Sequence, residues 1–169
     1  LEGPFLSVKK KGAHQEQYLK IPSVDLFDVL YKAANKRVKV LSLAPELDNA
    51  MELIKHVRNK DIVVGFAHSA ANYATTKESI ENGVSLCTHL FNAMEPLSHK
   101  DAGPIGAFLT TDKTFVELIT DGVHVNKEVL EIVYKTKNPG EIIIVTDAVS
   151  PAATNMSKFS ILGIDLEVR

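Results

Sequence analysis

Three apolar runs in this chain are each followed by a residue that can bind a metal ion or move a proton. The runs and these residues are 142–145 with Asp147, 62–67 with His68, and 84–88 with His89. The run before Asp147 is β-branched, which is typical of a strand buried on both faces. The carboxyl ends of parallel strands meet on one face of an α/β protein, and active sites form there. The sequence therefore predicts two histidines and an acid on one rim, as in a metal-assisted hydrolase.

Glu2 follows the first residue of a short apolar segment and supplies a carboxylate for the same rim. His68 and His89 are 21 residues apart, about one β/α unit, so they are expected to be neighbours. Imidazole and carboxylate groups bind Zn²⁺ and Fe²⁺, and a catalytic site keeps one position open for water. Such a cation lowers the pKa of bound water, and Asp147 is placed to act as general base and then general acid.

Simpler interpretations of the same residues stay open at this point. A single histidine after a strand is usually packed in the interior or faces solvent. Glu2 alone is a solvated carboxylate, and Asp147 alone is a possible N-cap for a following helix. His14 and His124, each considered alone, are typical of exposed loops and turns.

Composition limits the class of protein. The 169 residues are 45% apolar and carry a net charge of -2, which suits one packed domain. Lys plus Arg (19) does not exceed Asp plus Glu (21), so a nucleic-acid partner is not expected. No apolar run approaches the length of about 18 residues that suggests a membrane span. The single cysteine, Cys87, is expected to be buried and fits a reducing compartment, which favours the cytoplasm.

Strand and helix patterns alternate along the chain. Strands are predicted at 38–44, 62–67, 84–88, 114–120 and 142–145, with a further strand end at 1–6. Helices are predicted at 25–34 with Ser23 as N-cap, at 46–58, at 73–81 and at 127–135. Residues 91–107 are predicted to form a long loop. After Pro151 the pattern partly alternates over 159–168, as in a half-exposed antiparallel strand.

This order predicts an α/β fold, a partial (β/α)₈ TIM barrel with about six of its eight β/α units. A whole barrel needs about 250 residues, so we expect the first strands to precede Leu1. Residues 1–150 are assigned to the hydrolase barrel and 151–169 to the barrel exit and the start of a small β-sandwich. An open doubly wound sheet is the alternative, although no Gly-rich phosphate fingerprint follows any strand.

Several sequence strings resemble a known family along nearly the whole chain. The most specific is Thr88-His89-Leu90-Phe91-Asn92-Ala93-Met94. The others are Leu1-Glu2-Gly3-Pro4-Phe5, Lys11-Gly12-Ala13-His14, Leu43-Ala44-Pro45-Glu46, Ala67-His68-Ser69, Asp121-Gly122-Val123-His124-Val125 and Val145-Thr146-Asp147-Ala148. Together they resemble the N-acetylglucosamine-6-phosphate deacetylase family of the amidohydrolase superfamily.

The resemblance implies deacetylation of N-acetyl-D-glucosamine 6-phosphate to D-glucosamine 6-phosphate in amino-sugar catabolism. It implies a barrel with a small β-sandwich built from both chain ends. It also implies roles for the individual residues: the metal ligands are Glu2, His68 and His89, the general base is Asp147, the acetamido carbonyl is contacted by His14, and the sugar phosphate is held by Asn92, Ala93 and His124.

Lys100 stands where the family carries a phosphate-binding arginine. Lysine keeps the charge and loses the bidentate fork. The resemblance implies that this residue reaches a neighbouring subunit, and a homodimer is expected. The metal is Zn²⁺ or Fe²⁺, and early strands that precede Leu1 can supply a second site in some members. Two other functions remain open: a metal-dependent amidohydrolase with a different substrate, and a sugar-phosphate-binding protein without catalysis.

Overall fold

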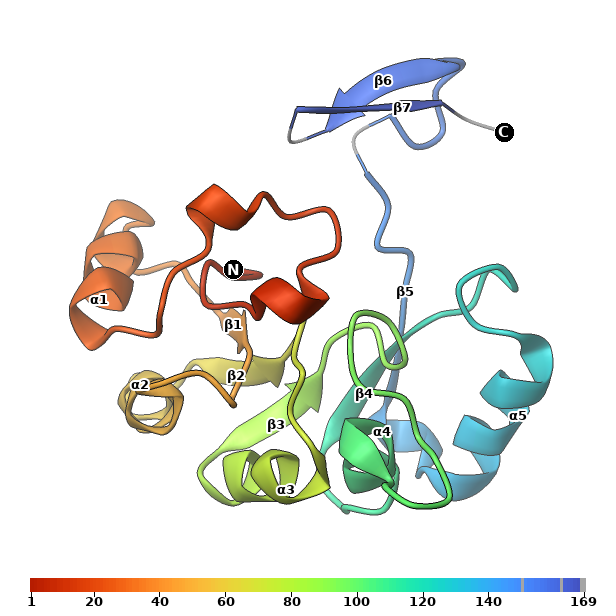
Figure 1. The fold of residues 1–169 in the computed structure, drawn as a ribbon, viewed down its shortest axis with the longest axis horizontal. Coiled ribbons are helices and arrows are strands. Elements are labelled where there is room, and N and C mark those ends of the chain that lie inside the picture. The colour runs from red at the N-terminus through yellow and green to blue at the C-terminus, as the bar shows by residue number, and fades with distance from the viewer. Residues whose placement is uncertain (150, 162, 168–169) are drawn as a thin grey trace.

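A parallel sheet of five strands forms the centre of the molecule in a computed structural model, which describes residues 1–149, 151–161 and 163–167. Its strands lie in chain order β1-β2-β3-β4-β5, and each pairs in parallel with the next (Figure 1). Their bounds are β1 Val40–Leu43, β2 Val63–Phe66, β3 Val84–Cys87, β4 Phe115–Ile119 and β5 Ile142–Val145. The chain is therefore a mixed α/β protein whose sheet is consistent with part of a barrel.

One helix precedes β1 and four connect successive strands, and these helices lie on the outside of the curved sheet in Figure 1. They are α1 Val24–Ala33, α2 Ala50–Arg58, α3 Tyr73–Glu81, α4 Gly103–Leu109 and α5 Lys127–Thr136, with short 3₁₀ turns at Val8–Lys10, Glu16–Tyr18 and Pro139–Glu141. The Ser23 side chain caps α1 by accepting the backbone N–H of Leu26, as the sequence predicted. None of the helices in the described part of the chain is long and apolar enough to cross a membrane.

Two predicted segments between the strands differ from the structure. The helix expected at 46–58 begins only at Ala50, because Asn49 takes a left-handed conformation with φ of 64° and interrupts the helix. The loop expected at 91–107 contains the start of α4, all of whose residues are buried. Its glycines and Pro104 suggested a loop, but proline fits the first turn of a helix and small residues allow close packing.

The sequence predicted six strands, and the described sheet has five. Residues 1–3 run beside β1 but make only an isolated parallel bridge, between Glu2 and Ser42. The N–H of Gly3 donates to the carbonyl of Ser42, and the N–H of Ser42 donates to the carbonyl of Leu1. The segment lies where a neighbouring strand would lie and is too short to count as one.

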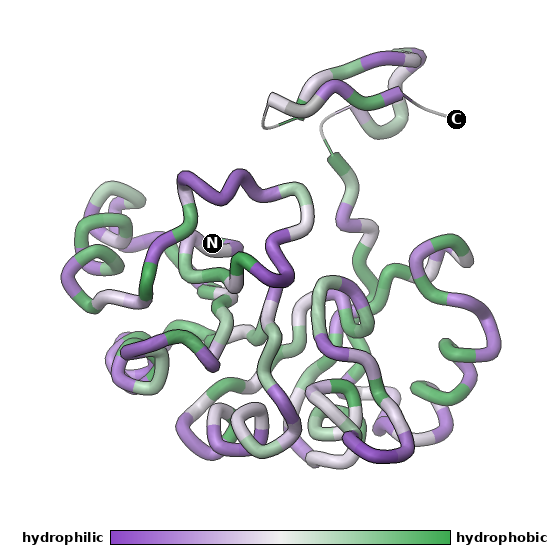
Figure 2. Tube along the Cα trace, viewed as in Figure 1, coloured by the Kyte–Doolittle hydropathy of each residue, from purple (hydrophilic) through white to green (hydrophobic). Residues whose placement is uncertain are grey.

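The hydrophobic core fills the space between the outer face of the sheet and the helices. Leu41, Leu43, Val64, Phe66 and Val116 point to this face and are fully buried. Figure 2 shows apolar segments along the strands and polar segments on the loop that follows the N-terminus. This burial on the outer face leaves the opposite face free to carry polar groups.

The inner face of the sheet carries small and polar residues. Ser42 on β1 and Thr88 after β3 form a buried hydrogen bond of 2.8 Å between their hydroxyls. Gly65 on β2 lies between them, because a Cβ built there would come within 2.5 Å of Ser42 Oγ and 3.3 Å of Thr88 Oγ1. The three strands can approach in this way because position 65 has no side chain.

Gly65→Ala is therefore expected to lower the free energy of unfolding by about 1–3 kcal/mol through overpacking. The matched control is Gly140→Ala, where the nearest heavy atom to the new Cβ would lie 3.5 Å away. The control should change stability by less than about 0.5 kcal/mol. Urea denaturation of the variants measures both values, and equal values would show that the Ser42–Thr88 pair tolerates a methyl group.

Strand β5 is an edge strand of the described sheet, which corrects the expectation that it is buried on both faces. Ile143 is 39% exposed and Ile144 is 72% exposed. Strand β5 pairs only with β4 among the described residues. The apolar sequence of β5 thus indicates a surface that is left uncovered in this chain.

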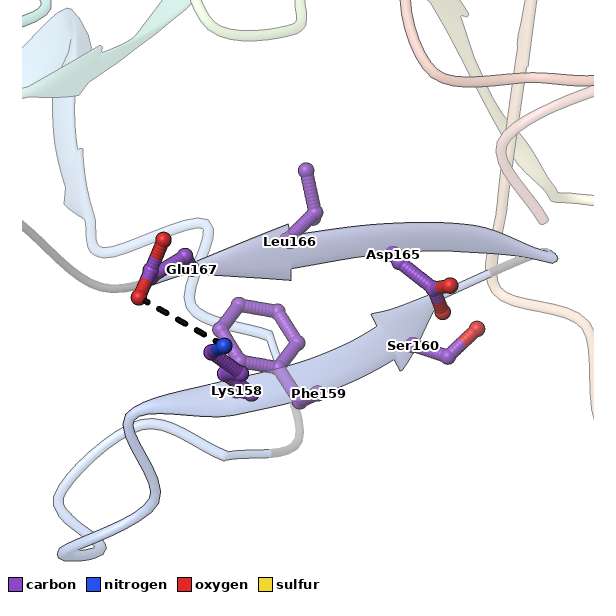
Figure 3. A pocket seen from close by; sticks show the side chains of 6 residues that line it. All are labelled: Lys158, Phe159, Ser160, Asp165, Leu166 and Glu167. Carbon is purple, nitrogen blue, oxygen red and sulfur yellow. Dashed lines mark ion pairs between the residues drawn. The ribbon is translucent and has the colours of Figure 1, made fainter.

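A two-stranded antiparallel sheet follows β5, made of β6 Lys158–Ile161 and β7 Ile164–Glu167. The sequence predicted a single antiparallel strand over 159–168, where the structure has a hairpin; Leu162 and Val168 lie outside the described residues. Figure 3 shows the pocket formed by the hairpin and the ion pair between Lys158 and Glu167, 4.0 Å apart. The hairpin turn approaches the loop before α1, because a Cβ at Gly163 would lie 2.9 Å from Gln15 Nε2.

A buried lysine ties β4, α5 and β5 together at the amino ends of the strands. The ammonium of Lys137 donates to the carbonyl of Thr111 at 2.7 Å and to Thr114 Oγ1 at 3.0 Å. It also pairs with Glu141 Oε2 at 3.1 Å. These contacts at the amino ends of the strands stabilise the fold, whereas active sites of parallel α/β sheets form at the carboxyl ends.

Candidate active site

The carboxyl ends of the strands bring the predicted residues to one rim. His68, His89 and Asp147 each follow the last residue of a strand by two positions, after β2, β3 and β5. All three have left-handed backbone conformations, with φ of 46°, 33° and 49°. Such conformations are strained for residues other than glycine and are concentrated at functional sites.

Glu2, His68 and His89 converge on one point. Glu2 Oε1 lies 2.8 Å from His68 Nε2 and 3.1 Å from His89 Nε2, and the two Nε2 atoms are 3.3 Å apart. The two histidines are almost fully buried, at 8% and 4% exposed. The three side chains form the one described group with metal-ligand geometry, and their ligand atoms all lie within 4.8 Å of one another.

The orientation of the His68 ring leaves a lone pair for a cation. His68 Nδ1 lies 2.7 Å from the carbonyl of Lys10, which can only accept, so Nδ1 carries the hydrogen. In the neutral ring, Nε2 is then unprotonated and faces the carboxylate of Glu2. Two acceptors at this separation require a proton or a cation between them. Backbone carbonyls commonly orient metal-binding histidines in this way.

The spacing of the three ligand atoms fits a small divalent ion. Around a tetrahedral ion with bonds of about 2.0–2.1 Å, neighbouring ligand atoms are about 3.3 Å apart. The observed separations of 2.8, 3.1 and 3.3 Å lie at or slightly below this value. Two imidazoles and one carboxylate also leave a fourth position for water, as catalytic zinc sites do. The residues present therefore fit the predicted cation.

Mutual interactions shift the titration of these groups. The close contacts with His68 and His89 hold the pKa of Glu2 well below its usual range. Burial opposes a charge on His89, but the hydrogen bond to Glu2, the charge of Glu2 and smaller contributions that include Asp147 together outweigh it and raise the pKa of the ring. Within the described residues, His89 Nδ1 is buried without a hydrogen-bond partner. The low pKa of Glu2 thus keeps its carboxylate ionised, with its charge where a cation would neutralise it.

His14 lies at the edge of this cluster. Its Nε2 is 4.0 Å from Glu2 Oε1, and its ring meets that of His68 edge to face with centroids 4.9 Å apart. Burial lowers the pKa of His14, and the nearby His68 acts in the same direction. The structure therefore places this predicted substrate contact beside the candidate metal ligands.

Asp147 is exposed on the same rim and, within the described part of the chain, makes no hydrogen bond to the three ligands. Its charge nevertheless reaches His89, since it contributes to raising the pKa of that histidine. An exposed carboxylate near the cluster is free to approach a bound substrate or water.

The other predicted substrate residues lie on loops around the rim. Asn92 and Ala93 follow His89 by three and four positions, and the Asn92 amide donates to the His89 carbonyl at 3.2 Å. His124 Nδ1 lies 2.7 Å from Asp121 Oδ2 in the loop after β4. Lys100 is exposed and its described bond is a backbone bond to Ser98, so the structure does not bring its ammonium to the cluster.

Sequence reasoning missed two acids and one carbonyl around this site. Asp121 follows the end of β4 by two positions, the same signal that identified His68, and it orients His124. Bonds from the backbone and ring of His124 lower the pKa of Asp121 to about 2. Glu117 faces the inner side of β4, and burial raises the pKa of its carboxyl. The carbonyl of Lys10 leaves no trace in the sequence, because any residue could supply it.

These features define a class: an α/β protein with a parallel sheet and a Glu-His-His cluster, suited to one divalent cation, at the strand ends. Comparison with known proteins then identifies relatives of this chain. The chain is 32% identical over 169 residues to N-acetylglucosamine-6-phosphate deacetylase of Bacillus subtilis and 36% identical over 176 residues to that of Bos taurus. These alignments include 100% and 99% of this chain, and the resemblance stated from the sequence is confirmed.

A solved structure has the same fold. An N-acetyl-D-glucosamine-6-phosphate deacetylase variant from Mycobacterium smegmatis, in complex with N-acetyl-D-glucosamine-6-phosphate, superposes with a TM-score of 0.96 at 30% identity. It covers 99% of this chain, which in turn covers 44% of that structure. The chain likewise spans 43% and 42% of the Bacillus and Bos relatives.

A further relative is named for a different sugar. N-acetylgalactosamine-6-phosphate deacetylase of Escherichia coli O157:H7 is 29% identical over 168 residues, which is 99% of this chain and 44% of that protein. No protein-family model matches the chain.

Proposed function

We propose that the protein containing this chain hydrolyses the acetamide of N-acetyl-D-glucosamine 6-phosphate to D-glucosamine 6-phosphate and acetate. The observation that carries the proposal is the convergence of Glu2, His68 and His89 at the strand ends. Its support comes from relatives and a solved structure named as deacetylases of this substrate, aligned along the chain. Amino-sugar catabolism is the corresponding metabolic setting.

The proposed frame for this chemistry is a (β/α)₈ barrel, of which residues 1–150 form about six units. Residues 151–169 would leave the barrel and begin a β-sandwich. The parallel order of β1 to β5 and the separate β6–β7 hairpin support this division. The uncovered apolar surface of β5 is what a further barrel strand would cover.

The proposed cofactor is one Zn²⁺ or Fe²⁺ held by Glu2, His68 and His89. When bound, it supplies Lewis acidity that lowers the pKa of water and polarises a carbonyl. The Lys10 carbonyl keeps the His68 ring oriented toward the ion. Burial of both histidines excludes competing water from the ligands.

The proposed proton transfers use Asp147. Its carboxylate removes a proton as water attacks the amide carbon, and the C–N bond then breaks as the same proton is delivered to the departing nitrogen. The second proton of the water also passes to the amine, so the products are a protonated amine and acetate, and atoms and charge balance. His14 would donate its ring N–H to the acetamido oxygen, where negative charge develops in the transition state.

The substrate phosphate would be held on the rim by the backbone of Asn92 and Ala93 and by His124. Asp121 fixes the His124 ring through a 2.7 Å contact, which supports a positioning function for that pair. Lys100 would add a positive charge and, as the family resemblance implies, would act across a homodimer interface. Lysine offers a point charge in place of a fork.

An acetate-release assay tests this proposal. The protein is expected to hydrolyse N-acetyl-D-glucosamine 6-phosphate with a kcat/KM at least about 100-fold above that for unphosphorylated N-acetyl-D-glucosamine, because remote binding energy contributes to the rate. Equal values for the two compounds would contradict the proposed substrate. They would favour another amidohydrolase activity.

A second candidate substrate is N-acetyl-D-galactosamine 6-phosphate, favoured by the relative named for that sugar. The two sugars differ only in one hydroxyl configuration, and they share the acetamide and the phosphate. The same assay with both phosphorylated sugars decides between them. A higher kcat/KM for the galacto sugar would replace the proposed substrate and keep the chemistry.

A further inference from the structure

Glu46 lies behind the strand ends, in the turn between β1 and α2. Its carboxylate accepts two hydrogen bonds from consecutive residues of another loop. Ser69 Oγ donates to Glu46 Oε2 at 2.5 Å, and the backbone N–H of Ala70 donates to Glu46 Oε1 at 2.6 Å. One side chain therefore holds the two residues that follow His68, a candidate metal ligand.

Ser69 extends this connection to a third loop. Its backbone N–H donates to the carbonyl of Ala93 at 3.1 Å, and it forms an isolated parallel bridge with Met94. The Ser69 hydroxyl also accepts the N–H of Ala71 at 3.0 Å. Ser69 is fully buried, so these bonds are shielded from water. The loops after β1, β2 and β3 are thereby linked through Ser69.

The linked segments are strained where they meet the site. His68 and Ala93 both hold left-handed backbone conformations, with φ of 46° and 51°. A residue other than glycine keeps this conformation only when its surroundings enforce it. The hydrogen bonds of Glu46 and Ser69 act on the residue after His68 and on Ala93 itself. They are therefore placed to enforce both conformations.

We propose that Glu46 is a positioning residue that, through Ser69, fixes His68 and the Asn92–Ala93 loop relative to each other. Among the described residues, the Glu46 side chain makes no hydrogen bond or ion pair to Glu2, His68 or His89 or to the Asn92–Ala93 loop. It acts through the Ser69 hydroxyl and the Ala70 N–H. The part of the proposal that concerns the substrate loop rests on the proposed function, and the part that concerns His68 rests on the metal site alone.

Two consequences follow from this arrangement. Loss of the Glu46 bonds should loosen His68 and weaken divalent metal binding by about 10–100-fold, as when an orienting partner of a metal ligand is removed. It should also raise KM for the phosphorylated sugar more than it changes kcat at saturating metal, because the Asn92–Ala93 loop loses its anchor. A role confined to folding would lower stability without either change.

Titration with Co²⁺ tests the proposal without substrate. Visible absorption of bound Co²⁺ reports affinity and coordination geometry, and thermal unfolding is followed in parallel. Glu46→Ala is expected to weaken Co²⁺ binding by about 10–100-fold and to alter the spectrum. Glu46→Gln keeps the size and an acceptor for Ala70, so its affinity should stay within about threefold of the parent. Glu52→Ala, at an exposed acid of α2, is the matched control and should behave as the parent.

Unchanged Co²⁺ affinity and spectrum in a folded Glu46→Ala protein would overturn the proposal, whatever the substrate proves to be. If that variant does not fold, Ser69→Ala decides, because it removes the hydroxyl link alone. Weaker Co²⁺ binding by Ser69→Ala supports the proposal, and parent-like binding overturns it. Failure of the sugar assay with a normal Co²⁺ result would count against the proposed function only.

Discussion

The variant His89→Ala is expected to lose the divalent metal and, with it, catalysis. His89 Nε2 is 3.1 Å from Glu2 Oε1 and 3.3 Å from His68 Nε2, so its removal leaves a two-ligand site. Metal affinity should fall by more than about 100-fold, the upper range for loss of a partner that only orients a ligand. Elemental analysis after dialysis, together with acetate release, measures both effects.

A matched control is His56→Ala. His56 lies on α2, and its Nε2 is 2.9 Å from Asp28 Oδ1 on α1, away from the rim. This variant should keep the parent metal content and rate, with at most a modest loss of stability. A His89→Ala protein that retained one equivalent of metal and parent turnover would remove His89 from the site.

The variant Asp147→Asn is expected to keep the metal and to lose turnover. Asp147 is exposed on the rim and makes no described bond to the ligands, so an isosteric amide should leave the cluster intact. An amide cannot take a proton from water, and kcat should fall by about 10²–10⁴-fold. Single-turnover acetate release and metal analysis of the same sample separate the two effects.

Asp112→Asn is the control for this change, since Asp112 is an exposed acid just before β4, at the opposite ends of the strands. It should be indistinguishable from the parent. Turnover of Asp147→Asn within about threefold of the parent would contradict the proton-transfer role. Loss of metal from Asp147→Asn would instead place this residue among the ligands.

The convergence of the cluster followed from local sequence patterns. Apolar runs identified β2 and β3, and the parallel arrangement then brought the residues after them to one rim. His68 and His89 could be predicted as neighbours for this reason. Glu2 was assigned to the same rim because it stands near the end of a short apolar segment, before Gly3-Pro4. In the structure, a single parallel bridge to Ser42 gives this segment the direction of β1.

Other features depend on groups that are distant in sequence. The carbonyl of Lys10, which orients His68, is present in every residue type and gives no signal. Glu46 was expected inside a helix, because the apolar residues after it have helical spacing. The left-handed conformation of Asn49 interrupts that helix, and Glu46 instead lies in the preceding turn, where its side chain accepts a hydrogen bond from Ser69. The exposure of β5 depends on which neighbours cover it, and composition cannot show that.

Anomalous diffraction from crystals of the metal-loaded protein, recorded at the absorption edge of the bound metal, tests the central claim most directly. The account predicts one peak bonded to Glu2 Oε1, His68 Nε2 and His89 Nε2 at about 2.0–2.2 Å. A protein that holds one equivalent of metal but shows its peak at other side chains would contradict it.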